Sequence, residues 1–196
     1  MPQMIDDTVL LSAHGKIPAP AAVSLVGFMG AGKTTVGRAL ATRLAWRFVD
    51  LDDLIQAREG RTIEQIFQES GEAAFRETEC RVLRETIVRL NAGALVLALG
   101  GGAFCEPSNR DSLAEAGIPA IFLDAPTEEL FRRSEQRGVI RPLRRDLEQF
   151  RRLYEQRRPL YLKSGLCVQT AGKDIAAVAD EIITALKLVP NPGAFE

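Results

Sequence analysis

The chain has 196 residues, of which 46% are hydrophobic and 26% charged, a composition that is typical of one globular domain in solution. Its formal net charge of −1 gives no case for a nucleic-acid partner, and no apolar run approaches the ~20 residues that a membrane helix needs. The first residues have neither the basic region nor the long apolar core of a secretory signal, so we expect a cytoplasmic protein, and a monomer.

The residue inventory limits the chemistry that the chain can perform. Its one histidine, His14, falls within residues 1–20, which we expect to form a flexible extension, so a histidine base or a histidine metal site is nearly excluded. The three cysteines are far apart, have no metal-ligand spacing, and are expected to be reduced packing residues. Carboxylates, lysine, arginine, backbone amides and a borrowed metal ion remain as the groups that could carry a reaction.

Short apolar runs alternate with helical stretches along the chain, which is typical of an α/β domain around a parallel sheet. The expected strands are residues 22–26, 47–50, 94–99, 119–123 and 166–170. The third is apolar throughout, as a strand covered on both faces should be. We therefore expect a three-layer fold with a five-stranded parallel sheet in a single domain, residues 21–188, followed by a tail, residues 189–196.

Helix starts are marked between these strands. Residues 33–44 read as a helix directly after the first strand, and Thr62 with Gln65 three residues later is a capping-box pattern. Thr127 is followed by Glu128 and Glu129, which suit the positive end of a helix dipole. Apolar residues between 175 and 186 recur with helical spacing and indicate a last helix that packs on the sheet.

The strongest functional signal is G-x-x-x-x-G-K-T at residues 27–34, directly after the first strand and directly before a helix. Glycines let the backbone wrap a phosphate chain, so that several N–H groups point inward at the helix N-terminus. We expect Lys33 to lie against the β- and γ-phosphates and the Thr34 hydroxyl to bind Mg²⁺. The ATP contacts expected in this loop are Gly30, Ala31, Gly32, Lys33, Thr34 and Thr35.

A pair of aspartates follows the second strand. Alternation along an extended chain would send Asp50 and Asp52 to the same side, at the rim where the phosphates would lie. One carboxylate could hold Mg²⁺ through water, and the other could orient an attacking hydroxyl or accept its proton. The alternative is a structural role as a helix N-cap, which we assign to Asp53 because a helix follows.

Glycines and arginines complete the set of candidate residues. Three glycines at residues 100–102 close the central strand and permit close approach of the backbone to a ligand, while residues 71–79 open a helix that carries Arg76. Residues 132–158 hold ten arginines against four acidic residues. Such a segment is either a solvated helix of mixed charge or a site for a polyanion, with residues 137–152 as a mobile lid over a transferring phosphate.

These motifs occur together in one family. The loop G-F-M-G-A-G-K-T-T-V-G-R, the D-x-D after the second strand, G-E-x-x-F-R-x-x-E, G-G-G, and R-P-L followed by R-x-P-L-Y resemble the shikimate kinases in identity, order and approximate spacing. The match runs from about residue 23 to residue 161. The resemblance implies a P-loop kinase fold and transfer of the γ-phosphate of ATP to the 3-hydroxyl of shikimate, a step toward chorismate and the aromatic amino acids.

The resemblance also implies roles for individual residues. The implied catalytic residues are Lys33, Asp52 and Arg141. The implied ATP contacts beyond the loop are Arg133, near the adenine, and the lid residue Arg141. The implied Mg²⁺ ligands are Thr34 and, through water, Asp50. The implied acceptor site consists of Asp52, Arg76, Gly100, Gly101, Gly102 and Arg157, with Glu79 as a supporting acid.

Two departures from the family pattern leave questions open. The family commonly has R-P-L-L and a longer lid, whereas here R-P-L is followed by Arg144 and Arg145, so that the lid could close differently. Arg158 adjoins Arg157 where the family often has a small residue, so either arginine could meet the substrate carboxylate.

Two other functions are compatible with parts of the sequence. A P-loop kinase for a nucleotide or for a sugar acid such as gluconate would share Lys33 and Thr34, but not their combination with Asp52, Arg76 and the glycine triplet. A ligand-sensing module without turnover should have lost one of the catalytic positions, and all of them are present.

Overall fold

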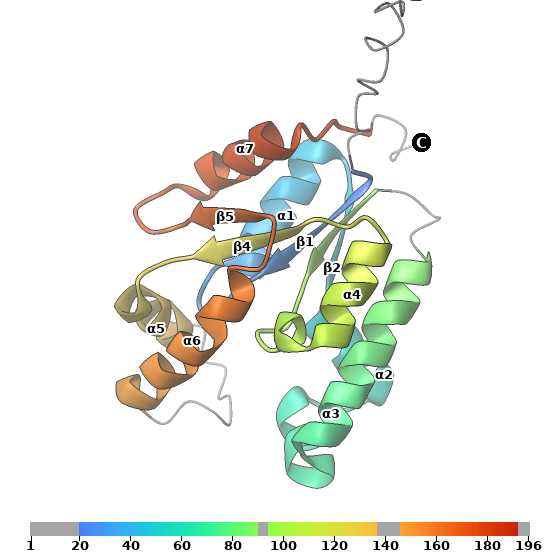
Figure 1. Ribbon diagram of the computed structural model, residues 1–196, viewed down its shortest axis with the longest axis vertical. Helices are drawn as coiled ribbons and strands as arrows, with labels where there is room; N and C mark the ends of the chain where they lie inside the picture. Colours follow the sequence, from blue (N-terminus) through green and yellow to red (C-terminus); the bar gives the residue numbers. More distant parts are fainter. Residues whose placement is uncertain (1–19, 90–93, 137–145, 192–196) are drawn as a thin grey trace, which may run out of the picture.

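The computed structural model describes residues 20–89, 94–136 and 146–191, and its centre is a parallel sheet of five strands (Figure 1). The strands are β1 (Ala22–Val26), β2 (Arg47–Asp50), β3 (Leu95–Ala98), β4 (Ala120–Asp124) and β5 (Leu166–Gln169). Every adjacent pair is parallel, in the order β2-β3-β1-β4-β5. The predicted α/β fold is confirmed, and each strand ends within one residue of its predicted limits.

Helices cover both faces of this sheet. The helices are α1 (Lys33–Leu44), α2 (Leu51–Glu59), α3 (Ile63–Val88), α4 (Pro107–Glu115), α5 (Thr127–Gln136), α6 (Leu147–Tyr161) and α7 (Ile175–Leu186), with a short 3-10 turn, η3 (Ala103–Cys105). In Figure 1, α1 and α7 lie together above the sheet, whereas α3 and α4 lie together below it. None of the described helices combines the length and the apolar composition that crossing a membrane would require.

The order of the strands places a crevice at the carboxyl end of β1. From this central strand the chain moves to β2 and β3 on one side of the sheet, and then to β4 and β5 on the other. Ligands of open parallel sheets bind where the strand order reverses in this way. The phosphate-loop motif follows β1, the glycine triplet follows β3, and Asp124 ends β4, so all three lie at this edge.

Close packing of α1 on the sheet fixes the helix that follows the phosphate loop. All five residues of β1 are buried. Gly37 in α1 lies so close to β2 that a Cβ at this position would be 2.4 Å from the ring of Phe48 and 3.1 Å from the side chain of Leu25. The absence of a side chain at Gly37 therefore lets α1 lie directly against the strands, with its first turn at the carboxyl edge.

Helix α3 begins with the predicted capping box and contains a break. The Gln65 N–H donates to Thr62 Oγ1 (3.2 Å), and the Thr62 N–H donates to Gln65 Oε1 (2.8 Å). The expectation that residues 71–79 open a new helix is only partly right, because α3 runs from Ile63 to Val88. Gly71 interrupts it with φ 81° and ψ 171°, so the helix restarts after this glycine.

The first residues of the predicted tail are attached to the domain. The indole N–H of Trp46 donates to the Val189 carbonyl (3.2 Å), and the Asn191 N–H donates to the Leu44 carbonyl (2.8 Å). These bonds hold residues 189–191 against the end of α1 and the segment that leads into β2, at the amino edge of the sheet and away from the crevice.

The break at Gly71 gives a prediction about stability. A Cβ at Gly71 would meet no atom within 4 Å, so Gly71→Ala adds only the strain of a positive φ. We expect this variant to lower the free energy of unfolding by about 1–2 kcal/mol in a urea titration. Gly165→Ala is the matched control, since its Cβ also meets no atom and its φ lies outside the positive range. A change within about 0.5 kcal/mol in both variants would contradict the assigned backbone strain.

Candidate functional site

The phosphate loop joins β1 to α1 and has the shape of an anion cradle. Gly27, Gly30 and Gly32 all have positive φ angles, of 141°, 79° and 93°. A Cβ at Gly30 would lie 2.1 Å from the carbonyl oxygen of Leu130, and one at Gly27 would lie 2.6 Å from that of Leu123. Gly32 precedes α1 as its N-cap and has no side chain to cap the helix, so the first N–H groups of α1 are left to meet a phosphate.

Lys33 and Thr34 lie in the first turn of α1 with defined partners. Lys33 Nζ donates to the carbonyl oxygens of Gly27 (2.8 Å) and Phe28 (3.1 Å), so the ammonium group folds over its own loop. Thr34 Oγ1 donates to Asp50 Oδ2 (2.8 Å). The hydroxyl and the carboxylate that were predicted to share a metal ion are thus in direct contact. One hydroxyl and one carboxylate are enough protein ligands for Mg²⁺, because this ion usually keeps several water ligands and binds phosphate oxygens of the nucleotide.

Asp50 and Asp52 do not share one side of a strand, and this prediction was wrong. Strand β2 ends at Asp50, and α2 begins at Leu51, so Asp52 belongs to a helix and strand alternation does not apply to it. The N-cap of α2 is Asp50, whose Oδ1 accepts from the Asp52 N–H (3.1 Å), and not Asp53 as predicted. The two carboxylates consequently serve different places, with Asp50 at Thr34 and Asp52 in the neighbouring pocket.

A first cavity lies at the start of α1 beside α5 and α7. It is lined by Gly30, Ala31, Gly32, Thr35, Val36, Arg133, Gln136, Thr170, Lys173, Ile175 and Val178. Arg133 is held in its wall, because Nη1 donates to Thr170 Oγ1 (3.0 Å) and Nη2 to the Thr170 carbonyl (3.1 Å). This cavity is lined by phosphate-loop residues and could hold the base of a nucleotide.

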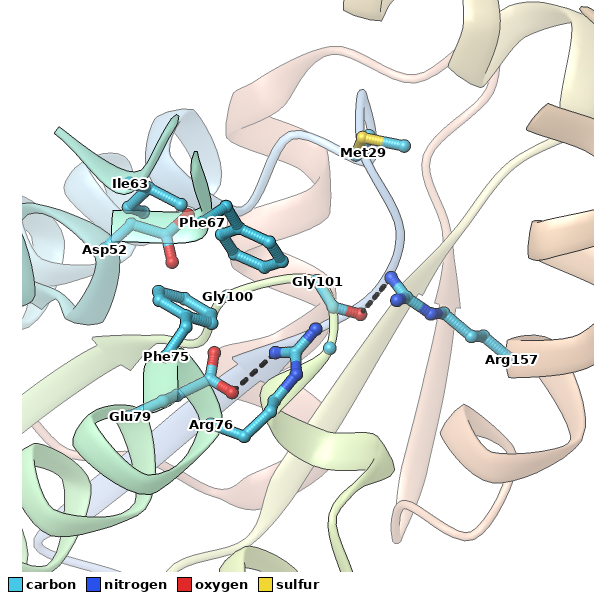
Figure 2. Close-up of a pocket in the computed structure, with 11 residues that line it drawn as sticks. Met29, Asp52, Ile63, Phe67, Phe75, Arg76, Glu79, Gly100, Gly101 and Arg157 are labelled. Carbon is cyan, nitrogen blue, oxygen red and sulfur yellow. Dashed lines mark hydrogen bonds and ion pairs between the residues drawn. The ribbon is translucent and has the colours of Figure 1, made fainter. Parts of the chain in front are cut away.

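A second pocket lies on the other side of the phosphate loop (Figure 2). It is lined by Met29, Asp52, Ile63, Phe67, Phe75, Arg76, Glu79, Gly100, Gly101, Gly102 and Arg157. Aliphatic and aromatic side chains form an apolar wall, and charged side chains and the glycine triplet line the rest. The sequence did not identify Met29, Ile63, Phe67 and Phe75 as pocket residues. Met29 and Phe75 stand within the quoted family motifs but were given no role there, and the i, i+4 spacing of Ile63 and Phe67 does not distinguish a pocket wall from a core.

Glycines bring the main chain against the charged groups of this pocket. A Cβ at Gly102 would lie 2.4 Å from Arg76 Nη2. A Cβ at Gly100 would lie 2.5 Å from Asp52 Oδ1 and 2.8 Å from Glu79 Oε1. A side chain at Gly100 or Gly102 would thus displace the two carboxylates or the guanidinium group, whereas a Cβ at Gly101 would lie no closer than 3.9 Å to its nearest neighbour.

Arg76 and Glu79 form an ion pair at the base of the pocket. Arg76 Nη1 lies 2.7 Å from Glu79 Oε2, and the Glu79 side chain is only 1% exposed. Glu79 Oε1 is buried and has no hydrogen-bond partner among the described residues. Burial raises the pKa of Glu79 from 4.5 to about 7, although the charge of Arg76 acts in the opposite direction.

The structure separates the two adjacent arginines of α6. Arg157 lines the pocket, where Nη1 donates to the Gly101 carbonyl (3.4 Å), and its guanidinium lies 6.0 Å from the centre of the Phe28 ring. Arg158 turns instead to Asp124 at the end of β4, with Nη2 2.9 Å from Oδ2. Figure 2 shows the Arg76 and Arg157 side chains reaching toward Gly101 from different elements. The lid residues Arg141, Arg144 and Arg145 lie outside the described residues, as does His14.

The parallel sheet, the phosphate loop and the charged pocket beside it define the class of P-loop kinases that act on small molecules. Within that class, a sequence model of the shikimate kinases matches residues 29–187. The chain belongs to the shikimate kinase family, whose members are ATP-dependent enzymes.

Relatives of known name agree with this assignment. A shikimate kinase of Thermus thermophilus is 39% identical over 178 residues, which cover 89% of this chain and 95% of that protein. The shikimate kinase of Ruegeria pomeroyi is 43% identical over 169 residues, 84% of each chain. A structure of the Acinetobacter baumannii shikimate kinase in complex with shikimate is 36% identical with a TM-score of 0.78, and covers 85% of this chain and 92% of that one.

More distant structures share the fold alone. A gluconokinase from Sinorhizobium meliloti is 20% identical to this chain with a TM-score of 0.56. The fold is therefore common to kinases of different acceptors, and the acceptor must be inferred from the pocket.

The raised pKa of Glu79 predicts a pH dependence of stability. The native state binds this proton more tightly than the unfolded chain does, so the contribution is complete below about pH 4.5 and is lost as the pH rises to about 7. The variant Glu79→Gln is the reference, because a glutamine side chain does not titrate in this pH range. Between about pH 4 and 8, the free energy of unfolding of the natural protein should fall relative to this variant by about 3 kcal/mol, measured by urea titration. Parallel curves for the two proteins would contradict the burial-induced shift.

Proposed function

We propose that this enzyme transfers the γ-phosphate of ATP to the 3-hydroxyl of shikimate, giving shikimate 3-phosphate and ADP. The hydroxyl oxygen forms the new bond to phosphorus, the bond from that phosphorus to the β–γ bridging oxygen breaks, and the hydroxyl proton is released. The observation that carries the proposal is the second pocket, which combines two arginines with a carboxylate beside a phosphate loop. A small polyhydroxy acid needs cations for its carboxylate and a carboxylate for its hydroxyls.

In this proposal the phosphate loop and α1 hold the triphosphate. The backbone N–H groups of the cradle bind phosphate oxygens, and Lys33 exchanges its bonds to the loop carbonyls for the β- and γ-phosphates. Thr34 and Asp50 would hold Mg²⁺, Asp50 through water. The metal ion, when bound, neutralises charge on the phosphates. Arg133, which is held by Thr170, would contact the adenine.

The acceptor is held by the second pocket. Arg76 and Arg157 bind the carboxylate from two sides, and the glycine triplet lets the acceptor approach the main chain. Asp52 accepts hydrogen bonds from the acceptor hydroxyls and turns the reacting oxygen toward the γ-phosphate. Because a loose phosphoryl-transfer transition state asks little of a base, orientation is the larger part of this role. The apolar wall formed by Phe67 and Phe75 excludes water that would otherwise compete with the acceptor.

A coupled assay of ADP release tests the reaction. With MgATP present, shikimate should stimulate ADP release strongly, whereas gluconate and quinate should not. Lys33→Ala should lose at least about a thousandfold in turnover, because the charge that stabilises the phosphates is removed, and Lys163→Ala, on the exposed surface, should match the natural protein. Stimulation by gluconate alone would move the assignment to a sugar-acid kinase. ATP binding without stimulation by any acceptor would favour a sensing module.

The carboxylate clamp is tested by Arg76→Lys. Lysine keeps a positive charge beside Glu79 but cannot form two parallel hydrogen bonds to a carboxylate. We expect the KM for shikimate to rise by about tenfold, with the KM for ATP changed less than about twofold. Arg81→Lys is the matched control, since Arg81 lies on the same helix, is exposed, and pairs with Glu59. An unchanged KM for shikimate in Arg76→Lys would show that the clamp lies elsewhere.

A further inference from the structure

Near its carboxyl end, helix α6 carries the adjacent arginines Arg157 and Arg158, and only one of them can face the acceptor pocket. Neighbouring residues of an α-helix point about 100° apart around its axis. Arg157 lines the pocket, and Arg158 lies on the next face of the helix. The rotation of α6 about its axis therefore decides which guanidinium group the acceptor meets.

Asp124, the last residue of β4, holds the Arg158 face of this helix. Its Oδ2 accepts from Arg158 through Nη2 (2.9 Å) and Nε (3.3 Å), and its Oδ1 accepts from the hydroxyl of Tyr154, one turn earlier on α6. Oδ2 also accepts from Gln169 Nε2 (3.2 Å) on β5, and Oδ1 from the Ala125 N–H (3.0 Å). Arg158 Nε donates in turn to Tyr154 Oη (3.1 Å).

Burial makes these contacts specific. Asp124 is 3% exposed, and a carboxylate taken out of water must be matched by hydrogen bonds and opposite charge. The Arg158 side chain is 42% exposed and would otherwise be free to turn into solvent. Asp124 is fixed at the end of β4, so its hydrogen bonds to Tyr154 and Arg158 form only when α6 has the matching rotation about its axis. The contacts of Asp124 with α6 therefore define one rotation of that helix.

Arg157 itself is held by longer contacts. It donates a 3.4 Å hydrogen bond to the Gly101 carbonyl, and its guanidinium lies 6.0 Å from the ring centre of Phe28. One turn further on, the hydroxyl of the buried Tyr161 donates to the same Gly101 carbonyl. The helix is thus attached at Asp124 and at Gly101, and Arg157 lies between the two attachments. Its position depends on them more than on its own bonds.

We propose that Asp124, acting through Tyr154 and Arg158, is a positioning residue for acceptor binding. It sets the rotation of α6, so that Arg157 meets the carboxylate of the acceptor and Arg158 does not. The inference rests on the proposed function, in which Arg157 binds that carboxylate.

The side chain of Asp124 acts on the acceptor side rather than on the nucleotide side. Its backbone carbonyl accepts from the Thr170 N–H (2.8 Å) and from Thr170 Oγ1 (3.1 Å), and Thr170 fixes Arg133 in the nucleotide cavity. A change of the side chain alone leaves these main-chain contacts in place. Asp124→Asn should therefore alter the affinity for the acceptor and spare that for ATP.

The first test is steady-state kinetics of Asp124→Asn and Arg158→Gln, with shikimate and ATP varied in turn. In both variants the KM for shikimate should rise by about fivefold to tenfold, and the KM for ATP should stay within about twofold. Glu155→Gln is the matched control, because Glu155 is exposed on the same helix and lies outside the expected lid and outside both cavities. Its kinetics should equal those of the natural protein. Melting temperatures are recorded for all variants, and Arg158→Gln, which changes a partly exposed side chain, carries the test if Asp124→Asn does not fold.

The second test asks whether the effect acts through Arg157. In an Arg157→Ala background, Asp124→Asn should cause no further loss in kcat/KM for shikimate, because the group that it positions is absent. If the loss in kcat/KM of the double variant equals the product of the losses of the two single variants, the inference is overturned. It is also overturned if Asp124→Asn and Arg158→Gln lower the melting temperature but leave the KM for shikimate unchanged. If Arg157→Ala raises this KM but Asp124→Asn and Arg158→Gln do not, the positioning role alone is wrong. If Arg157→Ala leaves it unchanged, the proposed carboxylate clamp fails as well.

Discussion

The carboxyl ends of β1, β3 and β4 lie at one edge of the sheet, and the whole site depends on this arrangement. Strand β1 leads into the phosphate loop, β3 into the glycine triplet, and β4 ends in the buried Asp124. An antiparallel order would send these segments to opposite edges. Glycine then makes the arrangement usable, since Gly100 and Gly102 let the main chain lie against Asp52, Glu79 and Arg76 with no side chain between them.

Features that depend on neighbours in the sequence could be predicted from the sequence. The phosphate loop was identified because the spacing of its glycines, lysine and threonine can be read together with the strand before it and the helix after it. Helix α1 was predicted with the limits that the structure has, and the capping box of Thr62 and Gln65 forms both of its hydrogen bonds. In each case a few adjacent residues determine the local backbone, so distant parts of the chain are not needed.

Features that depend on distant contacts could not be predicted in this way. The family resemblance favoured Arg157 but left Arg158 as an alternative, and the two are distinguished by the contact of Arg158 with Asp124 and of Arg157 with Gly101, both far earlier in the chain. The end of β2 at Asp50 was predicted correctly, but strand alternation was extended beyond it to Asp52, whereas Asp50 caps α2 and the chain turns into this helix at once. The apolar wall of the pocket was missed for a similar reason, because a phenylalanine on a helix has the same pattern whether it faces a core or a ligand.

The break in α3 at Gly71 divides the residues that this helix contributes to the proposed acceptor pocket into two segments. Ile63 and Phe67 lie before the break, while Phe75, Arg76 and Glu79 lie after it. The first segment is therefore joined to the ion pair of Arg76 and Glu79 through the non-helical residue Gly71. Substitutions at Ile63 and Phe67 can thus alter the shape of this pocket without changing the segment that carries its ion pair, so that one part of the wall is open to redesign apart from the charge.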